Sequence, residues 1–578
     1  MAAPMREKHA NRRIRLLLAI FAVVFAAMLA RAAWLQGVQA AHLSALAKSQ
    51  HEETQSIPAG RGTIFDRTGV QLAIGEQKTT VYADPYLVRN PRAIALAAHA
   101  VLGVDPNTLL PQLMNRKSRF VYVKRFADPA TAEVFLKKGF QGIESYPEEL
   151  RTYPQAGVGA QVLGYAGVDD HGLGGLELQY DRKLAGRAGK QTIVRDPTGR
   201  TIDVISSRPA WQGADVFTTL DHTIQAQAEK VLRETVSRWG AKDATAIVLD
   251  PSTGEVLAMA QTPGFDANNT SNVARWSPGL LRNRAVTDTY EPGSTFKLVT
   301  ITGALSDHLV TPNTRFTLPY LFRYGTCWQC TVHDAELRGT VNYSVAQILE
   351  YSSNVGAVTL AKKLGPERLA DWVRRFGFGS TTGIDFPGES PGFVLPLDQW
   401  SDPTIGNVPI GQGISVTPIQ MASVYAAVAN GGVWIQPHLV ERVGGRAPER
   451  WAHRRLMSAE VDREVKKMLT GVVADQGATG NEAQIPGYTV AGKTGTAQVP
   501  TSHGYSTTDY TASFVGMVPA THPRLVVLVK VDAPRGSIFG GVVAAPAFAA
   551  IAKFDLQYLE VPPDAPRTLT ASSSSGYG

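Results

Sequence analysis

The feature that most constrains this chain is an apolar run near its N-terminus. Residues 16–30 read LLLAIFAVVFAAMLA without a polar side chain, and after Arg31 the apolar character continues to Leu35. Fifteen helical residues rise about 22 Å, which is short of a hydrocarbon core of about 30 Å. A helix that continues to Leu35 is long enough if Arg31 reaches the interface and Trp34 lies among the headgroups. We therefore expect a transmembrane anchor at residues 16–36.

Basic residues before this run indicate its orientation. Residues 1–15 carry +4 of the chain's net charge of +7, from Arg6, Lys8, Arg12, Arg13 and Arg15 against Glu7. Basic flanks stay in the cytoplasm, so residues 1–15 are expected inside and the rest of the chain outside. The remaining +3 is no phosphate-binding surface, and nucleic acid is not expected as a partner. Two alternatives stay open for the run: a cleaved signal peptide with a site at residues 38–40, or a buried helix of a soluble protein.

The chain has only two cysteines, in the order Cys327-Trp328-Gln329-Cys330. Outside the cytoplasm this spacing allows a disulfide, although the ring is small. Free thiols are a second interpretation, and a metal site completed by His333 and Asp334 is a third. No catalytic role is assigned to these residues.

At 578 residues the chain is too long for one compact core, and 44% hydrophobic with 19% charged residues is ordinary globular composition. Residues 70–210 mix short strands and helices without a repeat. A larger unit is expected at residues 211–560, because the composition shifts near Trp211. The segment 561–578 is rich in proline and serine and is expected to be disordered.

Within the larger unit the pattern predicts an α/β arrangement. Asp221 is expected to cap a helix over residues 223–236, and a turn at residues 250–254 joins two apolar strands in a hairpin. Helical periodicity dominates residues 295–375. The strands are expected at Ala244–Leu249, Glu255–Ala260, Tyr488–Ala491, Ala512–Val518 and Leu525–Val531, with a closing helix at Pro546–Phe554.

The first candidate for chemistry is Ser294-Thr295-Phe296-Lys297. Pro292-Gly293 ends a loop and an apolar helix follows, so Ser294 is expected at a helix N-terminus, which favours a developing negative charge. A lysine at i+3 lies on the same helical face as the serine. If the helix is buried, desolvation lowers the pKa of Lys297 toward that of a general base, and a neutral amine can activate a serine hydroxyl. The alternative is a capping serine with a solvated lysine.

Two further motifs follow in order. Ser352-Ser353-Asn354 comes after a helical stretch at residues 344–350, and alone it fits an ordinary helix C-terminus. Lys493-Thr494-Gly495-Thr496 reads as a strand that ends in a cation, two hydroxyls and a glycine. Such an edge can hold a carboxylate through the lysine charge and the hydroxyls of Thr494 and Thr496, while Gly495 allows a substrate backbone to approach. Its alternative is a turn with an exposed lysine.

The three motifs together resemble the signature shared by serine β-lactamases and penicillin-binding proteins. The chain is most similar to the class B penicillin-binding proteins over about residues 10–558, with a middle motif that reads Ser-Ser-Asn. Glu291-Pro292-Gly293 before the serine looks like the cell-division (septal) subgroup. Further family-like stretches are Arg61–Gly69, Gly174–Asp181, Leu249–Met259, Phe376–Gly379 and Thr382–Glu389.

This resemblance implies a penicillin-binding/serine β-lactamase-like transpeptidase domain: an antiparallel sheet with helices and a helical subdomain. It implies an α+β pedestal at residues 37–210, of the non-catalytic, dimerisation type, and a catalytic domain in the periplasm or otherwise outside the cytoplasmic membrane.

The resemblance also implies a role for each motif residue. Ser294 attacks the D-Ala-D-Ala carbonyl of a peptidoglycan stem peptide and Lys297 takes its proton. Ser352 relays a proton to the departing D-alanine, held by Lys297 and Lys493, and Asn354 positions Lys297 and the substrate amide. The backbone N–H groups of Ser294 and Thr496 form the oxyanion hole. β-Lactams acylate Ser294, and no metal or organic cofactor is implied.

The implied partners are a polytopic glycosyltransferase of the shape, elongation, division and sporulation (SEDS) class and other division proteins. Two rival functions remain at this stage. A hydrolase on the same fold would need fast entry of water to the acyl-enzyme. A division scaffold would need no intact site.

Overall fold

The computed structural model describes residues 4–195, 201–270, 273–328, 330–447, 450–502 and 504–565. The chain divides into two compact units, one of residues 1–60 with 186–212 and one of residues 61–185 with 213–578. The sequence boundaries placed at residues 36, 210 and 560 therefore stay predictions, because compactness groups residues 61–185 with the larger unit. Most of the expected C-terminal tail, from residue 566 on, lies outside the described residues.

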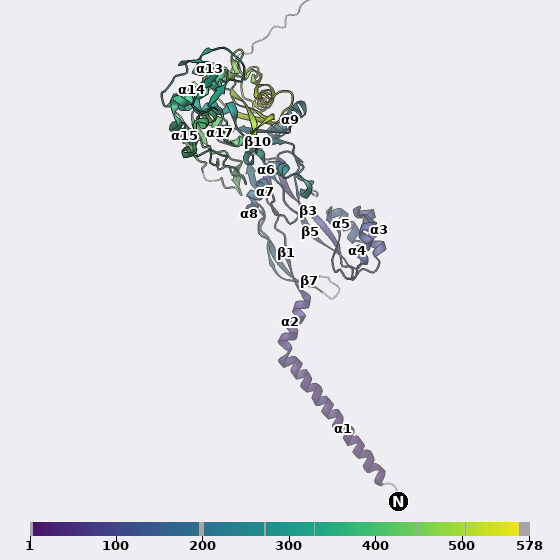
Figure 1. Ribbon diagram of the computed structural model, residues 1–578. Helices are drawn as coiled ribbons and strands as arrows, with labels where there is room; N and C mark the ends of the chain where they lie inside the picture. The colour runs from purple at the N-terminus through teal and green to yellow at the C-terminus, as the bar shows by residue number, and fades with distance from the viewer. Residues whose placement is uncertain are drawn as a thin grey trace, which may run out of the picture. The chain divides into compact units, whose positions relative to one another are not determined.

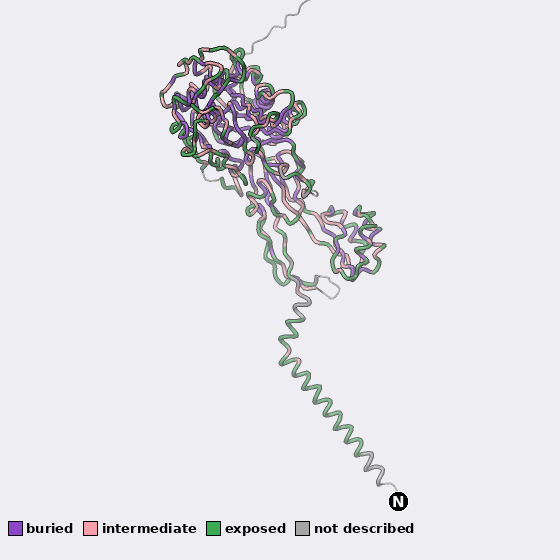
Figure 2. The backbone as a smooth tube through the Cα atoms, in the orientation of Figure 1, coloured by how far each residue is buried: buried purple, intermediate pink, exposed green. Residues whose placement is uncertain are grey.

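The first unit begins with the apolar helix. Helix α1 (Pro4–Ala33) continues through a π-helical segment (Trp34–Val38), and α2 (Ala40–His51) follows. Among the described residues one stretch, Asn11–Val38, is long and apolar enough to cross a membrane; its most apolar 18 residues have a mean hydropathy of 2.4 and none of them is buried. Figure 2 shows α1 exposed along its length where its burial is described. Such exposure argues against a helix buried in a soluble core.

A small antiparallel sheet completes the first unit. Its strands are β1 (Glu52–Ile57), β6 (Gly189–Arg195) and β7 (Thr201–Arg208), in the order β1-β6-β7. Residues Glu52 to Ile57 pair with Val194 to Gly189.

The central sheet of the larger unit is antiparallel throughout, in the order β10-β9-β20-β19-β18. Its strands are β9 (Asp243–Leu249), β10 (Val256–Thr262), β18 (Ala491–Thr501), β19 (Gly504–Val518) and β20 (Leu525–Asp532). The predicted hairpin of β9 and β10 is present. The strand expected at residues 488–491 is wrong, because the strand begins at Ala491. Lys493–Thr496 therefore lie inside β18, where Gly492 and Gly495 weaken the sequence signal of a strand.

Alternation along the central strands places apolar side chains on both faces of this sheet. Val248 and Val527 face a core shared with α9 (His222–Trp239) and α20 (Ala545–Tyr558). Leu249 and Val526 face the main core, which holds α12 (Lys297–Ser306) and α17 (Pro418–Ala429). Figure 1 shows α9 and α17 with the central strands between them. The sheet is therefore covered on both sides, and α12 lies in the interior.

The predicted helix cap at the start of the larger unit and the predicted closing helix at its end are both present. Asp221 accepts hydrogen bonds from the backbone N–H groups of Thr223 and Ile224 at the start of α9. The closing helix α20 covers the predicted residues 546–554. After it, the Val561 carbonyl accepts from the Tyr488 hydroxyl at 2.6 Å and Asp564 accepts from the Thr489 N–H at 2.7 Å. The first residues of the segment expected to be disordered are thus tied to the domain.

The region expected to be dominantly helical, residues 295–375, also contains strands. Four short strands lie between α12 and the next helix: β11 (Arg315–Leu318), β12 (Leu321–Arg323), β13 (Thr331–His333) and β14 (Val341–Ser344). Strands of three or four residues are too short for periodicity to reveal. The helices are α13 (Val345–Glu350), α14 (Asn354–Leu364) and α15 (Pro366–Arg375).

The rest of the larger unit carries a second sheet and shorter elements. This sheet runs β16-β8-β2-β3-β4, with β5 also paired to β3, and α3 to α5 pack against Val81 and Ala83 of β3. The strands of this sheet are β2 (Ile64–Phe65), β3 (Gln71–Ala83), β4 (Val121–Ala127), β5 (Ile143–Thr152), β8 (Val216–Thr218) and β16 (Val440–Val443), whereas β15 (Val433–Ile435) and β17 (His453–Arg455) pair in a separate two-stranded sheet. The helices are α3 (Pro91–Leu102), α4 (Pro106–Met114), α5 (Pro129–Leu136), α6 (Ala160–Leu163), α7 (Gly175–Gln179), α8 (Asp181–Leu184), α10 (Pro278–Leu281), α11 (Arg284–Thr287), α16 (Asp402–Asn407), α18 (Ala459–Ala474) and α19 (Gly540–Val543).

A buried ion network joins the two family-like stretches at residues 61–69 and 174–181. The Arg61 side chain is fully buried and donates to Glu177 at 2.7 Å and to Asp181 at 2.8 Å. Arg151 donates to the other Glu177 oxygen at 2.6 Å. Two arginines therefore share one buried carboxylate. The role of these stretches is to hold the fold, because removing either partner would leave a charge uncompensated in the interior.

Candidate active site

Ser294 lies in a tight turn that leads into a buried helix. Residues Gly293–Phe296 form a single 3₁₀ turn, and α12 begins at Lys297. The Thr295 hydroxyl donates to the Pro292 carbonyl at 2.8 Å, and the Tyr425 hydroxyl donates to the Thr295 carbonyl at 3.0 Å. The turn is thus fixed by its neighbours. Ser294 itself is partly exposed, and its hydroxyl has no hydrogen bond within the described part of the chain.

Lys297, the first residue of α12, has a strongly perturbed pKa. Its side chain is fully buried, and its Nζ donates to Asn354 Oδ1 at 2.7 Å and to Ser352 at the carbonyl (2.5 Å) and Oγ (3.2 Å). Burial lowers the pKa of Lys297 to about 7, and the negative charge of Asp334 acts in the opposite direction. The fall in pKa expected from the sequence is present. Near neutral pH a large share of these amines is uncharged.

Ser352 contacts Lys297 because its backbone adopts an unusual conformation. It follows α13 with a φ of 57°, in the left-handed region that a residue with a side chain rarely adopts. In this conformation both its carbonyl and its hydroxyl lie within reach of Lys297 Nζ. Ser353 then caps α14 by accepting from the Gly356 N–H. A strained residue at a charged, buried contact is typical of a functional site.

The strand β18 approaches the serine turn from the other side. A Cβ on Gly293 would lie 2.7 Å from the Thr496 carbonyl, and one on Gly495 would lie 2.9 Å from the Pro292 carbonyl and 2.3 Å from Ser513 Oγ. Gly293 also has a φ of 55°. The lack of a side chain at Gly495 therefore allows β18 to lie against the serine turn. The sequence did not reveal this structural requirement for glycine.

Lys493 is the second fully buried lysine. Burial, and next the positive charge of Lys297, lower the pKa of Lys493 well below its usual value. Its Nζ donates to Thr494 Oγ1 at 3.1 Å, which in turn donates to Thr479 Oγ1 at 3.0 Å. The Thr496 hydroxyl accepts from the Gly540 N–H at 3.2 Å, so its own proton stays available. β18 is an edge strand of the central sheet, and its outer edge pairs with no described strand.

All the motif residues predicted from the sequence therefore lie in one region. Lys297, Ser352 and Asn354 are joined directly by hydrogen bonds, and Lys493 is coupled to Lys297 through charge. Ser352 was expected to contact both lysines. The contact with Lys297 is present, but Lys493 Nζ has no hydrogen bond to Ser352 among the described residues. Two residues were missed, Thr479 and, as a neighbour of the motifs, Asp334. The sequence carries no signal for either, because both arrive through tertiary packing.

The cysteines form a disulfide, and the free-thiol and metal alternatives do not hold. Cys327 and Cys330 are bonded, with their Cα atoms 5.1 Å apart. Cys330 is fully buried. Asp334, which the metal alternative used as a ligand, is instead bonded to Arg338, Ser353 and the Val355 N–H.

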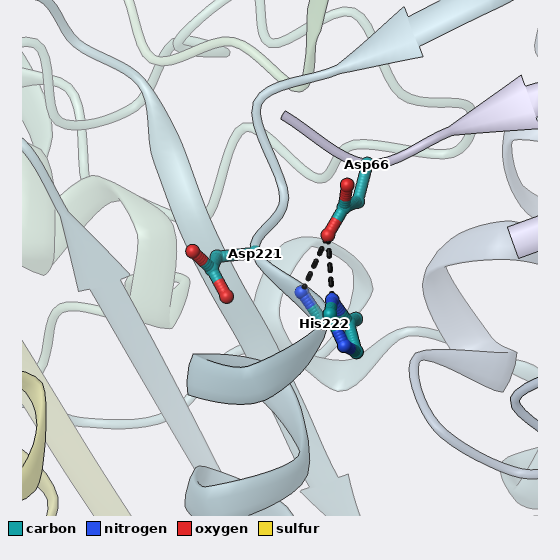
Figure 3. Close-up of side chains that lie close together, drawn as sticks. All are labelled: Asp66, Asp221 and His222. Carbon is teal, nitrogen blue, oxygen red and sulfur yellow. Dashed lines mark hydrogen bonds and ion pairs between the residues drawn. The ribbon is translucent and has the colours of Figure 1, made fainter. Parts of the chain in front are cut away.

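One other group among the described residues has donors close enough to hold a metal ion. It consists of Asp66, Asp221 and His222 (Figure 3), with one ligand atom from each within 4.8 Å of the others. Burial alone would raise the pKa of Asp66, but hydrogen bonds from His222, Val70 and Thr68 lower it. The His222 Nδ1 lies 2.6 Å from Asp66, and Asp221 caps α9. Because these carboxylates are already occupied, we assign the group to the fold.

Comparison with known proteins agrees with this geometry. Residues 244–553 match the model of the penicillin binding protein transpeptidase domain, and residues 56–218 match that of the penicillin-binding protein dimerisation domain. Penicillin-binding protein PbpB of Mycolicibacterium smegmatis is 35% identical over 93% of this chain and 89% of its own length. Peptidoglycan D,D-transpeptidase FtsI of Escherichia coli K12 is 32% identical over 97% of this chain and 94% of its own. A crystal structure of penicillin binding protein 3 from Mycobacterium tuberculosis, complexed with aztreonam, aligns with a TM-score of 0.69 at 31% identity, over 89% of this chain and 99% of that one.

The sheet, the interior helix that begins at Lys297 and the matched domain define a transpeptidase fold of the serine acyl-transfer type. With a dimerisation domain ahead of it, the chain belongs to the class B penicillin-binding proteins, in the subgroup that contains FtsI and PbpB. The predicted fold class and the family resemblance are confirmed.

Proposed function

We propose that this protein is a peptidoglycan D,D-transpeptidase of cell division, and that it cross-links stem peptides through an acyl-enzyme on Ser294. The observation that carries the proposal is the buried amine of Lys297. It lies three residues after the serine, has a pKa of about 7 and is held by Ser352 and Asn354. An amine in this state can accept the serine proton at neutral pH.

The first half of the reaction forms an ester. The Ser294 oxygen attacks the carbonyl between the two terminal D-alanines, and its proton passes to the neutral Lys297. The backbone N–H groups of Ser294 and Thr496 stabilise the oxyanion, each contributing about 3 kcal/mol. The C–N bond to the last D-alanine then breaks, and Ser352 relays a proton to the departing amine. The terminal carboxylate is held beside Lys493 and Thr494 by the Thr496 hydroxyl, whose proton stays available, because the Thr494 hydroxyl already donates to Thr479.

The second half restores an amide. The amine of a neighbouring stem peptide attacks the ester, loses a proton through the same relay and releases Ser294. The unpaired outer edge of β18 supports this assignment, because an extended peptide can add to such an edge as a further strand. β-Lactams would acylate Ser294 in the same way, and the Mycobacterium tuberculosis relative forms a complex with aztreonam.

Covalent labelling with a fluorescent penicillin tests the nucleophile. Ser294→Ala is expected to abolish labelling, and intact-protein mass spectrometry should find a single adduct on the unaltered protein. Ser306→Ala, at the end of the same helix, is the matched control and should label normally. Labelling retained in Ser294→Ala would refute the assignment.

We also propose the protein's place in the cell. The apolar stretch Asn11–Val38 would anchor it in the cytoplasmic membrane as a single span, with the basic N-terminus inside and the catalytic unit outside. A SEDS-class glycosyltransferase and other division proteins would be its partners. Co-purification from membranes with a tagged SEDS protein tests this, and a chain that lacks residues 1–38 should lose the association if the helix is the contact.

A further inference from the structure

A hairpin that the three motifs do not include contacts the active site directly. Strands β12 and β13 pair antiparallel, with Leu321 opposite His333. The Cys327–Cys330 disulfide closes its tip, and the Tyr324 N–H donates to the Cys330 carbonyl at 3.0 Å. Lys362 of α14 donates to the Tyr324 carbonyl at 2.7 Å. The hairpin is therefore covalently closed at one end and tied to α14.

His333, the last residue of β13, and Asp334, which follows it, bind the start of α14. The His333 carbonyl accepts from Asn354 Nδ2 at 3.0 Å. The Asp334 carboxylate accepts from Ser353 Oγ at 3.0 and 3.1 Å and from the Val355 N–H at 3.0 Å. Three consecutive residues of the middle motif region are thus bonded to two consecutive residues of the hairpin.

These contacts fix which way the Asn354 amide points. Its Nδ2 donates to the His333 carbonyl, so its Oδ1 is the atom that accepts from Lys297 Nζ at 2.7 Å. An amide turned the other way would place its Nδ2 donor against the Lys297 amine and its Oδ1 acceptor against the His333 carbonyl. The hairpin therefore sets the hydrogen-bond partner of the candidate base.

We propose that Asp334, held by the disulfide-closed β12–β13 hairpin, is a positioning residue that orients Asn354 and Lys297 for acylation of the serine. Asp334 is buried and touches no reacting atom. The inference rests on the proposed role of Lys297. It assigns a use to the two cysteines, which belong to none of the motifs.

The negative charge of Asp334 allows its proposed positioning role to be tested independently of its hydrogen bonds. The charged groups that face Lys297 are Lys493 from β18 and Asp334 from the end of β13, and Asp334 is itself paired with Arg338. The negative charge of Asp334 favours the protonated form of Lys297, and its removal should disfavour that form. A residue that only supported the fold would leave the pH profile of acylation in place.

The test measures the rate of acylation by a fluorescent penicillin against pH, on the purified full-length protein. Asp334→Asn keeps the shape and removes the charge. We expect the midpoint of the acid limb to move to lower pH by about 1 pH unit, and the plateau rate to fall about tenfold as the hold on Asn354 weakens. Asp371→Asn, an exposed carboxylate on α15, is the matched control and should move neither. An unchanged midpoint and plateau in Asp334→Asn would overturn the proposal.

A second variant separates the effect of the Asp334 hydrogen bond from the effect of the Asp334 charge. Ser353→Ala removes the hydroxyl that donates to Asp334 and keeps the charge, so the plateau rate should fall while the midpoint stays. This variant also decides the matter if Asp334→Asn does not fold. A wild-type plateau in Ser353→Ala would then count against the proposal.

The disulfide provides the third arm. Cys327→Ala with Cys330→Ala, or the wild-type protein reduced with dithiothreitol, should acylate more slowly. Combined with Asp334→Asn, the loss should be smaller than the product of the two separate effects, because both act through one contact. Fully multiplicative effects would contradict the link. Failure of this inference is distinguishable from failure of the proposed function, since only the latter allows Ser294→Ala to be labelled.

Discussion

The pKa of Lys297 makes a quantitative prediction about acylation. With a pKa of about 7, roughly half of the Lys297 amines are neutral at pH 7, whereas an amine with the usual value of 10.5 would be neutral in about one molecule in 3,000. Burial thus raises the population of the active base by about 1,500-fold. Because only a neutral amine can accept the serine proton, the proposed role of Lys297 predicts that the rate of acylation rises as the pH rises through 7 and levels off above about pH 8.

The assay is the second-order rate of acylation by a fluorescent penicillin between pH 5.5 and 9. Wild-type protein should show an acid limb of slope one that is half-maximal near pH 7. Lys297→Ala should lose about 10²- to 10⁴-fold in rate, which is the usual contribution of a positioned base, and should lose the limb as well. Lys363→Ala, an exposed lysine of α14, is the matched control and should keep both.

Two results would refute this reasoning. A wild-type rate that is flat from pH 6 to 8.5 would mean that no group with a pKa near 7 controls acylation. A normal acid limb in Lys297→Ala would mean that another group accepts the proton. In either case the burial of Lys297 would have to serve the fold alone.

Three further predictions concern the rest of the molecule. Gly495→Ala should reduce acylation by about 100-fold with little change in melting temperature, because its Cβ would push β18 away from the serine turn by clashing with Pro292 and Ser513; wild-type acylation would show that the close approach is not needed. Glu177→Gln should lower the free energy of unfolding by about 3–5 kcal/mol in a denaturant titration, whereas Glu133→Gln at an exposed pair should leave it unchanged; equal stabilities would refute the role of the buried network. Removal of residues 1–38 should move the protein from the membrane fraction to the soluble fraction on centrifugation, and persistence in the membrane would point to a second anchor.

The sequence predicted the parts of the site that are local in the chain. Pro292-Gly293 before an apolar helix placed Ser294 at a helix start, and a helix followed by Ser-Ser-Asn placed Ser352 beyond α13. Asp221 as a cap and the β9–β10 hairpin followed from turn chemistry that needs only neighbouring residues. In each of these cases the deciding interaction joins residues only a few positions apart.

The sequence failed where a tertiary contact decides the local structure. Gly492 and Gly495 lower strand propensity, so the motif was placed at the end of a strand rather than inside it, yet pairing with β19 overrides that preference. The left-handed backbone of Ser352 has no sequence signal, because serine rarely adopts it. The short strands β11 to β14 were missed for lack of length. Asp334 was weighed only as a metal ligand, since its partners at residues 353–355 are distant in sequence.

The missed features at Lys493–Thr496, Ser352 and Asp334 all belong to the candidate active site, and they have a common physical cause. Two buried lysines, of which Lys297 lowers the pKa of Lys493 by its charge, and a serine in a left-handed conformation all oppose local stability. Such an arrangement persists only if the surrounding fold holds it, and here the sheet, α14 and the disulfide-closed hairpin do so. The sequence preferences for stable local structure are therefore violated at the residues to which we assign the proposed proton transfers. Ser352→Gly relieves the strained backbone and also removes the hydroxyl proposed as the proton relay, so it should keep or raise stability while it lowers acylation. An unchanged rate of acylation in this variant would show that neither the strain nor the hydroxyl has a part in the reaction.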